Sequence, residues 1–354
     1  MKIEEVKNFY KNKRVLITGH TGFIGSWLTK WLTMLDANVC GFALDPPTQP
    51  NLYETTDLSS KILDVRGDIR DAEILRKTLT SFRPEILIHL AAQPIVITSY
   101  NDPVETFDIN VTGMVNLLNE IRKVKSVKEL IVVTSDKSYK NMEWVYPYRE
   151  SDILGGKDPY SASKSCQEIV IDMFRETYFV NSNVGISSVR AGNVLGGGDW
   201  AKNRLIPDLV RGAMDNQTTQ IRNPESIRPW QHVLEPISGI LALGEKLWSN
   251  TKFSGPWNFG PEHKGGVTVL ELTKKFLSYY GVGKYEIRRG SDFMESQYLN
   301  LDISKAKKEL NWAPRFDFDE TVRETAEWYK RYSENPDSID QITEKQILEY
   351  SSLE

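Results

Sequence analysis

Residues 14–28 read RVLITGHTGFIGSWL, and this stretch decides the fold. Its first five residues, 14–18, have the length and apolar character of a buried strand. Glycines follow at Gly19, Gly22 and Gly25, and the apolar residues after them recur with the spacing of a helix. A strand that passes through a glycine turn into a helix is the opening of a βαβ unit, so the sequence predicts a parallel sheet from its first residues onward.

The same alternation continues as far as residue 190. Strands are expected at 14–18, 38–44, 61–67, 85–90, 129–134 and 184–190, and helices begin near 27, 71, 103 and 160. Strands separated by helices are typical of an α/β fold with a Rossmann-type, doubly wound parallel sheet. We therefore predict a Rossmann domain over 1–190, completed by segments near 231–260.

After residue 191 the alternation stops. Three consecutive glycines and several prolines are followed by a short strand at 297–303 and by helices at 268–280 and 318–333. This pattern predicts a smaller C-terminal α+β lobe over 191–345 that binds the substrate. The tail beyond about residue 334 is polar, and its structure is only weakly predicted.

Composition excludes several classes of function. The chain of 354 residues is 40% apolar and 26% charged, with a formal net charge of −4. That balance does not favour binding to nucleic acid, and no stretch approaches the roughly 18 apolar residues of a membrane span. Two cysteines, Cys40 and Cys166, form no disulfide framework, and four histidines without clustered spacing predict no metal site. A cytoplasmic protein is expected.

The glycine turn has the properties of a dinucleotide site. Glycines there let the backbone approach a pyrophosphate at the helix N-terminus. Asp45 lies twenty residues past Gly25, where an acid accepts hydrogen bonds from a ribose 2′-hydroxyl and repels a 2′-phosphate. NAD is therefore expected as the cofactor rather than NADP; the alternative is a turn without a ligand. The loop residues predicted to bind NAD are Gly19, Thr21, Gly22, Phe23, Ile24 and Gly25.

Two further strand ends are expected to line this site. Asp68, with Ile69 beside it, follows the third strand and is placed to contact the adenine edge, or else to cap the next helix. Leu90, Ala91 and Ala92 end the fourth strand, and the small alanines there let a dinucleotide lie close. His89, in the apolar strand before them, is expected in the core.

A tyrosine and a lysine lie four residues apart in DPYSASKSCQE, on one face of a predicted helix. A lysine ammonium near a phenol lowers the phenol pKa, so we expect Tyr160 to accept a proton from a substrate hydroxyl with the help of Lys164. The alternative is that the tyrosine and the lysine are a pair of surface side chains without a catalytic role. Ser135, which follows the fifth strand, lies 25 residues upstream.

From ITGHTGFIG through YSASK the chain resembles the extended short-chain dehydrogenase/reductases. The resemblance implies that Ser135, Tyr160 and Lys164 form the catalytic triad and that Asn110, in DINVTG, is the helix asparagine of the family. It also implies pairing through the helices after the fourth and fifth strands, which gives a homodimer or a tetramer.

The residues after the triad serine narrow the resemblance. In TSDKSYKN (134–141), Asp136 and Lys137 supply an acid/base pair that a simple epimerase does not need. A sugar 4,6-dehydratase needs it, because oxidation at C4 acidifies C5, whose proton a base removes while an acid protonates the departing C6 hydroxyl. Most such enzymes carry Asp-Glu, whereas Asp-Lys resembles one branch, the CDP-glucose 4,6-dehydratases. Lys137 is expected either to be the base or, if it stays charged, to stabilise the enolate oxygen; an exposed ion pair is the structural alternative.

The substrate diphosphate needs cations and hydrogen-bond donors. The resemblance implies such contacts for Arg204, Arg228 and Asn193, although arginines also cap helices and pair with surface acids. Gln93, His232 and Tyr298 are further candidates, with a structural role as the alternative for His232 and Tyr298.

Three functions are therefore weighed. The leading one is NAD-dependent dehydration of CDP-glucose to its 4-dehydro-6-deoxy form. The alternatives are a 4,6-dehydratase for another nucleotide-sugar or a nucleotide-sugar 4-epimerase. A non-catalytic NAD-binding regulator is a different class, but such a protein usually loses the tyrosine or the lysine that this chain keeps.

Overall fold

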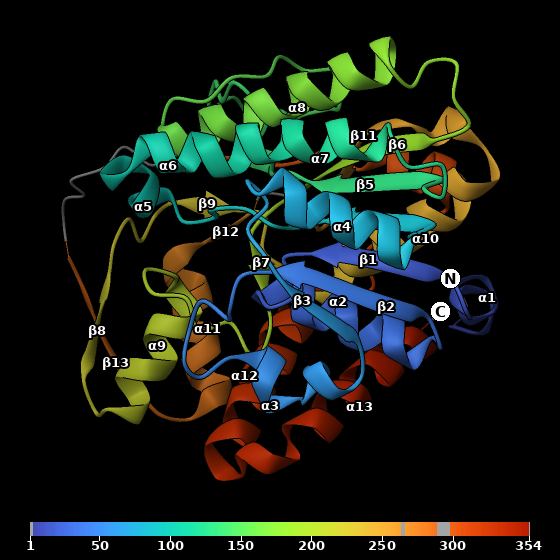
Figure 1. The fold of residues 1–354 in the computed structure, drawn as a ribbon. Helices are drawn as coiled ribbons and strands as arrows, with labels where there is room; N and C mark the ends of the chain where they lie inside the picture. The colour runs from blue at the N-terminus through green and yellow to red at the C-terminus, as the bar shows by residue number, and fades with distance from the viewer. Residues whose placement is uncertain (1–2, 263–265, 289–297, 354) are drawn as a thin grey trace.

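A sheet of seven parallel strands lies at the centre of the molecule, in the order β11-β6-β5-β4-β1-β2-β3 (Figure 1). The computed structural model describes residues 3–262, 266–288 and 298–353. The strands are β1 (Arg14–Thr18), β2 (Asn38–Ala43), β3 (Leu63–Arg66), β4 (Ile86–His89), β5 (Glu129–Val133), β6 (Gly185–Ala191) and β11 (Gly255–Phe259). Each strand predicted before residue 191 overlaps one of these, and the doubly wound Rossmann-type sheet is confirmed.

Helices cover both faces of the sheet (Figure 1). On one face, an apolar cluster that includes Leu75, Leu118 and Ile171 joins α4 (Ala72–Phe82), α7 (Gly113–Ile121) and α8 (Pro159–Thr177) to the strands. A larger cluster fills the other face and includes residues of α2 (Phe23–Met34), α10 (Leu234–Ser249), α12 (Phe318–Glu334) and α13 (Ile339–Ser352). The core is therefore two apolar layers separated by the sheet.

Shorter elements build the second lobe. It contains α9 (Leu205–Met214), α11 (Val269–Tyr280) and three two-stranded pairs: β8 (Thr218–Ile221) with β13 (Lys284–Ile287), β9 (Ile227–Arg228) with β12 (Val267–Thr268), and β7 (Val194–Leu195) with β10 (Gln231–His232). The remaining helices are α1 (Ile3–Tyr10), α3 (Leu52–Thr55), α5 (Val96–Asn101) and α6 (Pro103–Phe107). The division of the chain at residue 190 stays a prediction.

Two predicted elements differ in the structure. The helix expected over 103–123 is divided into α6 and α7 by a π-helical turn, Asp108–Thr112. In the strand expected over 297–303, Gln297 lies outside the described residues, and the rest contributes a single bridge between Leu301 and Tyr148. The alternating pattern there reflects burial of Leu299 and Leu301 rather than a ladder of hydrogen bonds.

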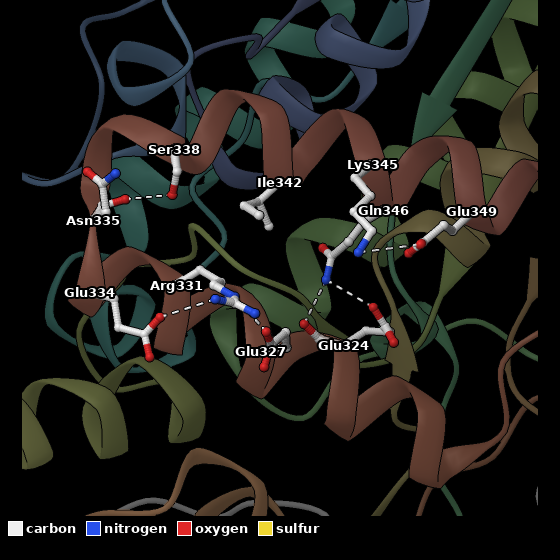
Figure 2. Close-up of a pocket in the computed structure, with 10 residues that line it drawn as sticks. All are labelled: Glu324, Glu327, Arg331, Glu334, Asn335, Ser338, Ile342, Lys345, Gln346 and Glu349. Atoms are coloured by element: carbon white, nitrogen blue, oxygen red, sulfur yellow. Dashed lines mark hydrogen bonds and ion pairs between the residues drawn. The ribbon is translucent and has the colours of Figure 1, made fainter.

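The polar tail is a packed helix, α13, which the weak signal in the sequence did not predict. Only two of its six buried side chains are aliphatic; the six are Ile339, Thr343, Gln346, Ile347, Tyr350 and Ser351. Trp328 of α12 donates a hydrogen bond of 3.0 Å from Nε1 to Thr343 Oγ1. A groove lined mainly by charged side chains lies between α12 and α13 (Figure 2), and none of the predicted site residues lines it.

Among the helices that the structure describes, none combines the length and apolar character needed to cross a bilayer.

Candidate active site

The glycine turn packs directly against the loop that follows β4. Gly19 has φ +76°, and a Cβ atom there would lie 2.6 Å from the backbone nitrogen of Ala91. A Cβ on Gly25 would lie 2.1 Å from the carbonyl oxygen of Gly19. Since neither contact is sterically possible, these two glycines are required by the fold itself.

Gly22 differs, because the nearest atom to a Cβ there is the Gly19 oxygen at 3.4 Å. It is the N-cap of α2, with no side-chain cap and no acid in the first turn. The amide groups at this helix end, which include those of Phe23 and Ile24, form an open, electropositive cradle that fits the pyrophosphate of NAD. Thr21 Oγ1 donates a hydrogen bond of 3.0 Å to the Leu44 carbonyl and ties the turn to the end of β2.

The acids predicted to contact the cofactor lie beside β2 and β3. The side chain of Asp45 is 91% exposed, and its Oδ1 lies 3.6 Å from Arg66 Nε. Asp68 accepts a hydrogen bond of 2.6 Å from Arg70 Nη2, and the hydrogen bonds from Arg70 hold the pKa of Asp68 below its usual range. Asp71 fills the capping role that was the alternative for Asp68, because its carboxylate accepts from the first amides of α4.

The other predicted NAD contacts lie in the same region. Ile69 is buried and leaves no room for a side chain at position 113 of α7. A Cβ atom on Gly113 would lie 2.6 Å from Ile69 Cγ2. Leu90 and Ala92 are partly exposed after β4, and Leu90 N donates to the Thr18 carbonyl at 3.0 Å. His89 is buried in the core, as expected, with Nδ1 2.7 Å from Thr18 Oγ1.

Ser135, Asp136 and Lys137 lie where β5 ends. Ser135 caps a 3₁₀ turn formed by residues 136–138, its Oγ accepts from Lys137 N at 3.1 Å, and it donates to Asp136 Oδ1 at 3.1 Å. This turn packs against α8, which carries Tyr160. Lys137 Nζ lies 5.9 Å from the centroid of the Tyr160 ring. The structure therefore brings the two halves of the predicted catalytic set together.

The pKa of Tyr160 is displaced in the direction opposite to the one predicted. Burial raises the pKa of Tyr160 to about 12, although a hydrogen bond with Ser135 and the charge of Arg204 both act to lower it. Lys164 Nζ lies 5.9 Å from the ring centroid, yet Lys164 is itself buried, and this desolvation lowers its own pKa to about 8. The prediction of a lowered tyrosine pKa was wrong because burial of Tyr160 itself disfavours the charged phenolate.

Asp136 is suited to act as a general acid. Burial raises its pKa, against the opposing effects of Lys137, of the Ser135 hydroxyl and of Arg228. Its Oδ2 is buried and has no hydrogen-bond partner within the described chain. A carboxyl group that retains its proton at higher pH is suited to donate it to a leaving hydroxyl.

A buried ion pair between α8 and β6 was not predicted from the sequence. Glu168, one turn after Lys164, accepts from Arg190 Nη2 at 2.8 Å, from Thr134 Oγ1 at 2.5 Å and from Ser188 Oγ at 2.7 Å. Its charge opposes the lowering of the Lys164 pKa. The available signal was Arg190, a charged residue inside a predicted central strand, which predicts a buried partner on a neighbouring element.

Both predicted substrate arginines lie close enough to a catalytic residue for their charges to act on its pKa. The charge of Arg204 acts on Tyr160, and that of Arg228 acts on Asp136. Arg204 Nη1 donates to Asp199 Oδ2 at 2.9 Å, and the charge of Asp199 raises the pKa of Arg204.

The remaining substrate candidates have structural contacts. Gln93 Nε2 donates to Thr106 Oγ1 at 2.9 Å, and its Oε1 accepts from Ile95 N at 2.6 Å, so its side chain shapes its own loop. His232 is fully buried, with its ring against Trp27.

Backbone carbonyls fix two more of these candidates. The carbonyl of Asn193 accepts from Gln231 N at 3.0 Å, and that of Tyr298 accepts from Asn141 Nδ2 at 2.9 Å; both side chains are half-buried. Asn110, in the π-helical turn, bonds Ser163 Oγ at 2.9 Å.

The residues that the structure describes contain no cluster of His, Cys, Asp and Glu side chains that could hold a metal ion.

Comparison with known proteins gives a consistent picture. A family model described as GDP-mannose 4,6 dehydratase matches residues 16–249. The CDP-glucose 4,6-dehydratase of Salmonella typhimurium is 46% identical over 98% of both chains. In fold, the chain resembles the dTDP-glucose 4,6-dehydratase of Streptomyces venezuelae, solved with NAD and TYD bound, with TM-score 0.77, 24% identity and coverage of 93% and 99%. It also resembles an epimerase of Methanothermobacter thermautotrophicus, with TM-score 0.81, 24% identity and coverage of 94% and 97%.

Proposed function

The chain belongs to the nucleotide-sugar dehydratase family described as GDP-mannose 4,6 dehydratase, within the extended short-chain dehydrogenase/reductases, and on that premise we propose that it is an NAD-dependent CDP-glucose 4,6-dehydratase. The product is CDP-4-dehydro-6-deoxyglucose. One observation carries the proposal beyond the family: Asp136 and Lys137 follow the triad serine, and Lys137 Nζ lies 5.9 Å from the Tyr160 ring.

The first step is oxidation at C4. Tyr160 removes the proton of the 4-hydroxyl, and Ser135 donates a hydrogen bond to the oxygen as it becomes a carbonyl. The hydrogen bond with Ser135 and the charge of Arg204 favour the ionised tyrosine, which offsets part of the cost of its burial. NAD, which the glycine turn and Asp45 would hold, would supply the oxidant for C4 and the reductant for C6 within one turnover.

The second step is loss of water. The new ketone acidifies the C5 proton, which Lys137 accepts in its neutral form, while protonated Asp136 donates to the C6 hydroxyl and releases water. The double bond between C5 and C6 would then be reduced at C6, and the Lys137 ammonium would return a proton to C5. Arg204 and Arg228 hold the diphosphate of the substrate.

A direct test follows the loss of water. The protein is incubated with CDP-, dTDP-, GDP- and UDP-glucose, and the masses of the products are measured by mass spectrometry. We expect CDP-glucose to lose one water. If no nucleotide-glucose loses water, the dehydratase assignment fails.

The role of Lys137 is tested in heavy water. We expect Lys137→Met to suppress exchange of deuterium into C5, whereas Lys140→Met, which removes an exposed lysine three residues away, should leave exchange unchanged. Normal exchange in Lys137→Met would show that another group is the C5 base.

A 4-epimerase is the second candidate, because the UDP-glucose 4-epimerase of Mycolicibacterium smegmatis is 27% identical over 91% of this chain. An epimerase inverts C4 without a change in mass. The same mass spectra, together with separation of the sugar isomers, therefore distinguish it from a dehydratase.

A homodimer or tetramer is also proposed. Ile169 and Met173 lie one turn apart on α8 and are 59% and 43% exposed. Two exposed apolar side chains on one helix face favour pairing with a second copy through α7 and α8. Ile169→Glu should lower the mass measured in solution if this face forms the interface. A cytoplasmic location stays a prediction.

A further inference from the structure

The turn that carries the predicted acid and base is held at both of its ends by one buried ion pair. This catalytic turn consists of residues 135–138. Thr134, which precedes it, donates a hydrogen bond from Oγ1 to Glu168 Oε1 at 2.5 Å. Tyr139, which follows it, has the centroid of its ring 4.8 Å from Arg190 Cζ. Because Glu168 and Arg190 are paired with each other, both flanks of the catalytic turn contact the same ion pair.

The ion pair is a fixed point of attachment. Glu168 Oε2 accepts from Ser188 Oγ at 2.7 Å and from Arg190 Nη2 at 2.8 Å. Arg190 Nη1 donates to the Glu150 carbonyl at 3.1 Å. The side chains of Glu168 and Arg190 are 4% and 3% exposed, so water hardly competes for these contacts. The pair therefore joins the catalytic turn firmly to β6 and α8.

Helix α8 carries the other half of the predicted catalytic set. Lys164 precedes Glu168 by four residues, which places both side chains on one face of the helix, and Tyr160 lies one turn earlier. A second contact joins the helix to the catalytic turn, because Ser165 Oγ donates to the Ser138 carbonyl at 2.8 Å. A shift of the turn against α8 would therefore change the distances between the groups that move the C4 and C5 protons.

The carboxylate of Glu168 divides its two oxygens between two strands. Oε2 accepts from Ser188 and Arg190 of β6, whereas Oε1 accepts from Thr134, directly after β5. The ion pair with β6 needs only Oε2, and a buried ion pair adds little net stability by itself. The bond from Oε1 to Thr134 is the part of the arrangement that fixes the catalytic turn.

We propose that Glu168 and Arg190 are positioning residues that hold the catalytic turn in register with the tyrosine and lysine of α8. They act through Thr134 and Tyr139 rather than on the substrate itself. This inference rests on the dehydratase function proposed above. The competing role is a purely structural connection between β6 and α8, which would affect stability but not the rate of water loss in the folded enzyme.

The first comparison uses two hydroxyls that donate to the same carboxylate. Thr134→Val removes the hydroxyl that precedes the catalytic turn, whereas Ser188→Ala, the matched control, removes the hydroxyl on β6. Thr134→Ser keeps the hydroxyl on a smaller side chain. For each full-length variant, kcat and KM for loss of water from the active nucleotide-glucose are measured by mass spectrometry, at a temperature below its melting transition.

We expect Thr134→Val to lower kcat by roughly 10- to 100-fold, since a misplacement of catalytic groups by about 1 Å costs up to about 100-fold in rate. KM should stay within about twofold of the wild type, because Arg204 and Arg228 still hold the diphosphate. Thr134→Ser should recover most of the rate. Ser188→Ala should keep the kcat of the wild type, because its hydroxyl does not lead to the catalytic turn.

Tyr139 gives a second comparison, which decides the matter if Thr134→Val does not fold. Tyr139→Phe keeps the ring beside Arg190 and loses the hydroxyl that donates to Asn258 Oδ1, whereas Tyr139→Leu removes the ring as well. We expect the kcat of the wild type in Tyr139→Phe and a lowered kcat in Tyr139→Leu, with KM unchanged in both.

Several results would overturn the inference. They are a wild-type kcat in folded Thr134→Val or Tyr139→Leu, equal losses in Thr134→Val and Ser188→Ala, and no recovery in Thr134→Ser. A loss that appears in KM alone would also contradict it, because it would place the ion pair in substrate binding. A wild type that removes water from no nucleotide-glucose is a separate outcome, seen before any variant is compared, and it would remove the dehydratase function itself.

Discussion

The guanidinium of Arg190 lies 2.8 Å from the carboxylate of Glu168, and both side chains are almost completely buried. Arg190 belongs to β6 and Glu168 to α8, so the pair joins a central strand to the helix that carries Tyr160 and Lys164. A buried ion pair adds little net stability by itself, but removal of one partner leaves an uncompensated charge in the core.

We predict that Glu168→Gln destabilises the protein by about 3–5 kcal/mol, because Arg190 keeps its charge without a counter-ion. The double variant Glu168→Gln/Arg190→Met should lose less than the sum of its two single variants, as measured by urea unfolding. Glu73→Gln, which breaks an exposed pair with Lys77 on α4, is the control and should leave the unfolding midpoint unchanged. Strict additivity in the cycle would contradict the coupling.

Gly22→Ala should fold normally yet bind NAD weakly. Gly22 has φ −78° and ψ 171°, which alanine adopts readily, and a Cβ there meets only the Gly19 oxygen at 3.4 Å. We expect stability within about 0.5 kcal/mol of the wild type and at least about tenfold weaker NAD binding by calorimetry, which corresponds to about 1.4 kcal/mol.

Gly25→Ala is the contrasting variant. Its Cβ would lie 2.1 Å from the Gly19 oxygen, so the turn must distort and the melting temperature should fall. Unchanged NAD affinity in Gly22→Ala would show that the pyrophosphate of NAD does not bind against Gly22.

The sequence predicted those features that local pattern determines. The strand before Gly19 and the helix that begins near residue 71 depend on local patterns, and the structure has both. The partners of Glu168 and Arg190 lie on separate elements, so only the folded chain shows that these charges meet. The pKa of Tyr160 was misjudged for the same reason, since burial is a property of the whole fold.

Helix α13 shows a second limit of pattern reading. Its inner face includes Thr343 and Gln346, which a hydrophobic pattern does not count as core residues. The Tyr350 hydroxyl donates to Glu235 Oε2 at 2.6 Å and lies 2.9 Å from Ser238 Oγ. Polar partners on α10 thus make a polar helix face compatible with burial.

Glu235 should make stability depend on pH. Burial raises its pKa from 4.5 to about 7 in the folded protein, against hydrogen bonds from Tyr350, Phe316 and Arg315. The folded state therefore holds its proton more tightly than the unfolded chain, and the free energy of unfolding should fall as pH rises from about 4.5 to about 7, by about 3 kcal/mol from this group. Glu235→Gln should remove that part of the slope when unfolding is compared at pH 5 and pH 8. Parallel slopes in the two proteins would show that Glu235 titrates normally.

Lys30 connects α2, the helix that starts at the glycine turn, to α13 through two ion pairs. Its side chain is 2% exposed, and its Nζ lies 2.5 Å from Asp340 Oδ1 and 2.6 Å from Glu344 Oε1. Lys30→Met leaves both acids on α13 without this cation, but they are partly exposed, so we expect a loss of about 2 kcal/mol rather than the full cost of a buried orphan charge. Hydrogen exchange of the α13 amides should accelerate, because the lost contact is local.

Lys61→Met is the matched control. Lys61 also contacts Asp340, at 3.1 Å, but its side chain is 34% exposed, so the loss of stability should stay below about 1 kcal/mol. Equal effects of the two variants would mean that burial of Lys30 adds nothing to the attachment of α13.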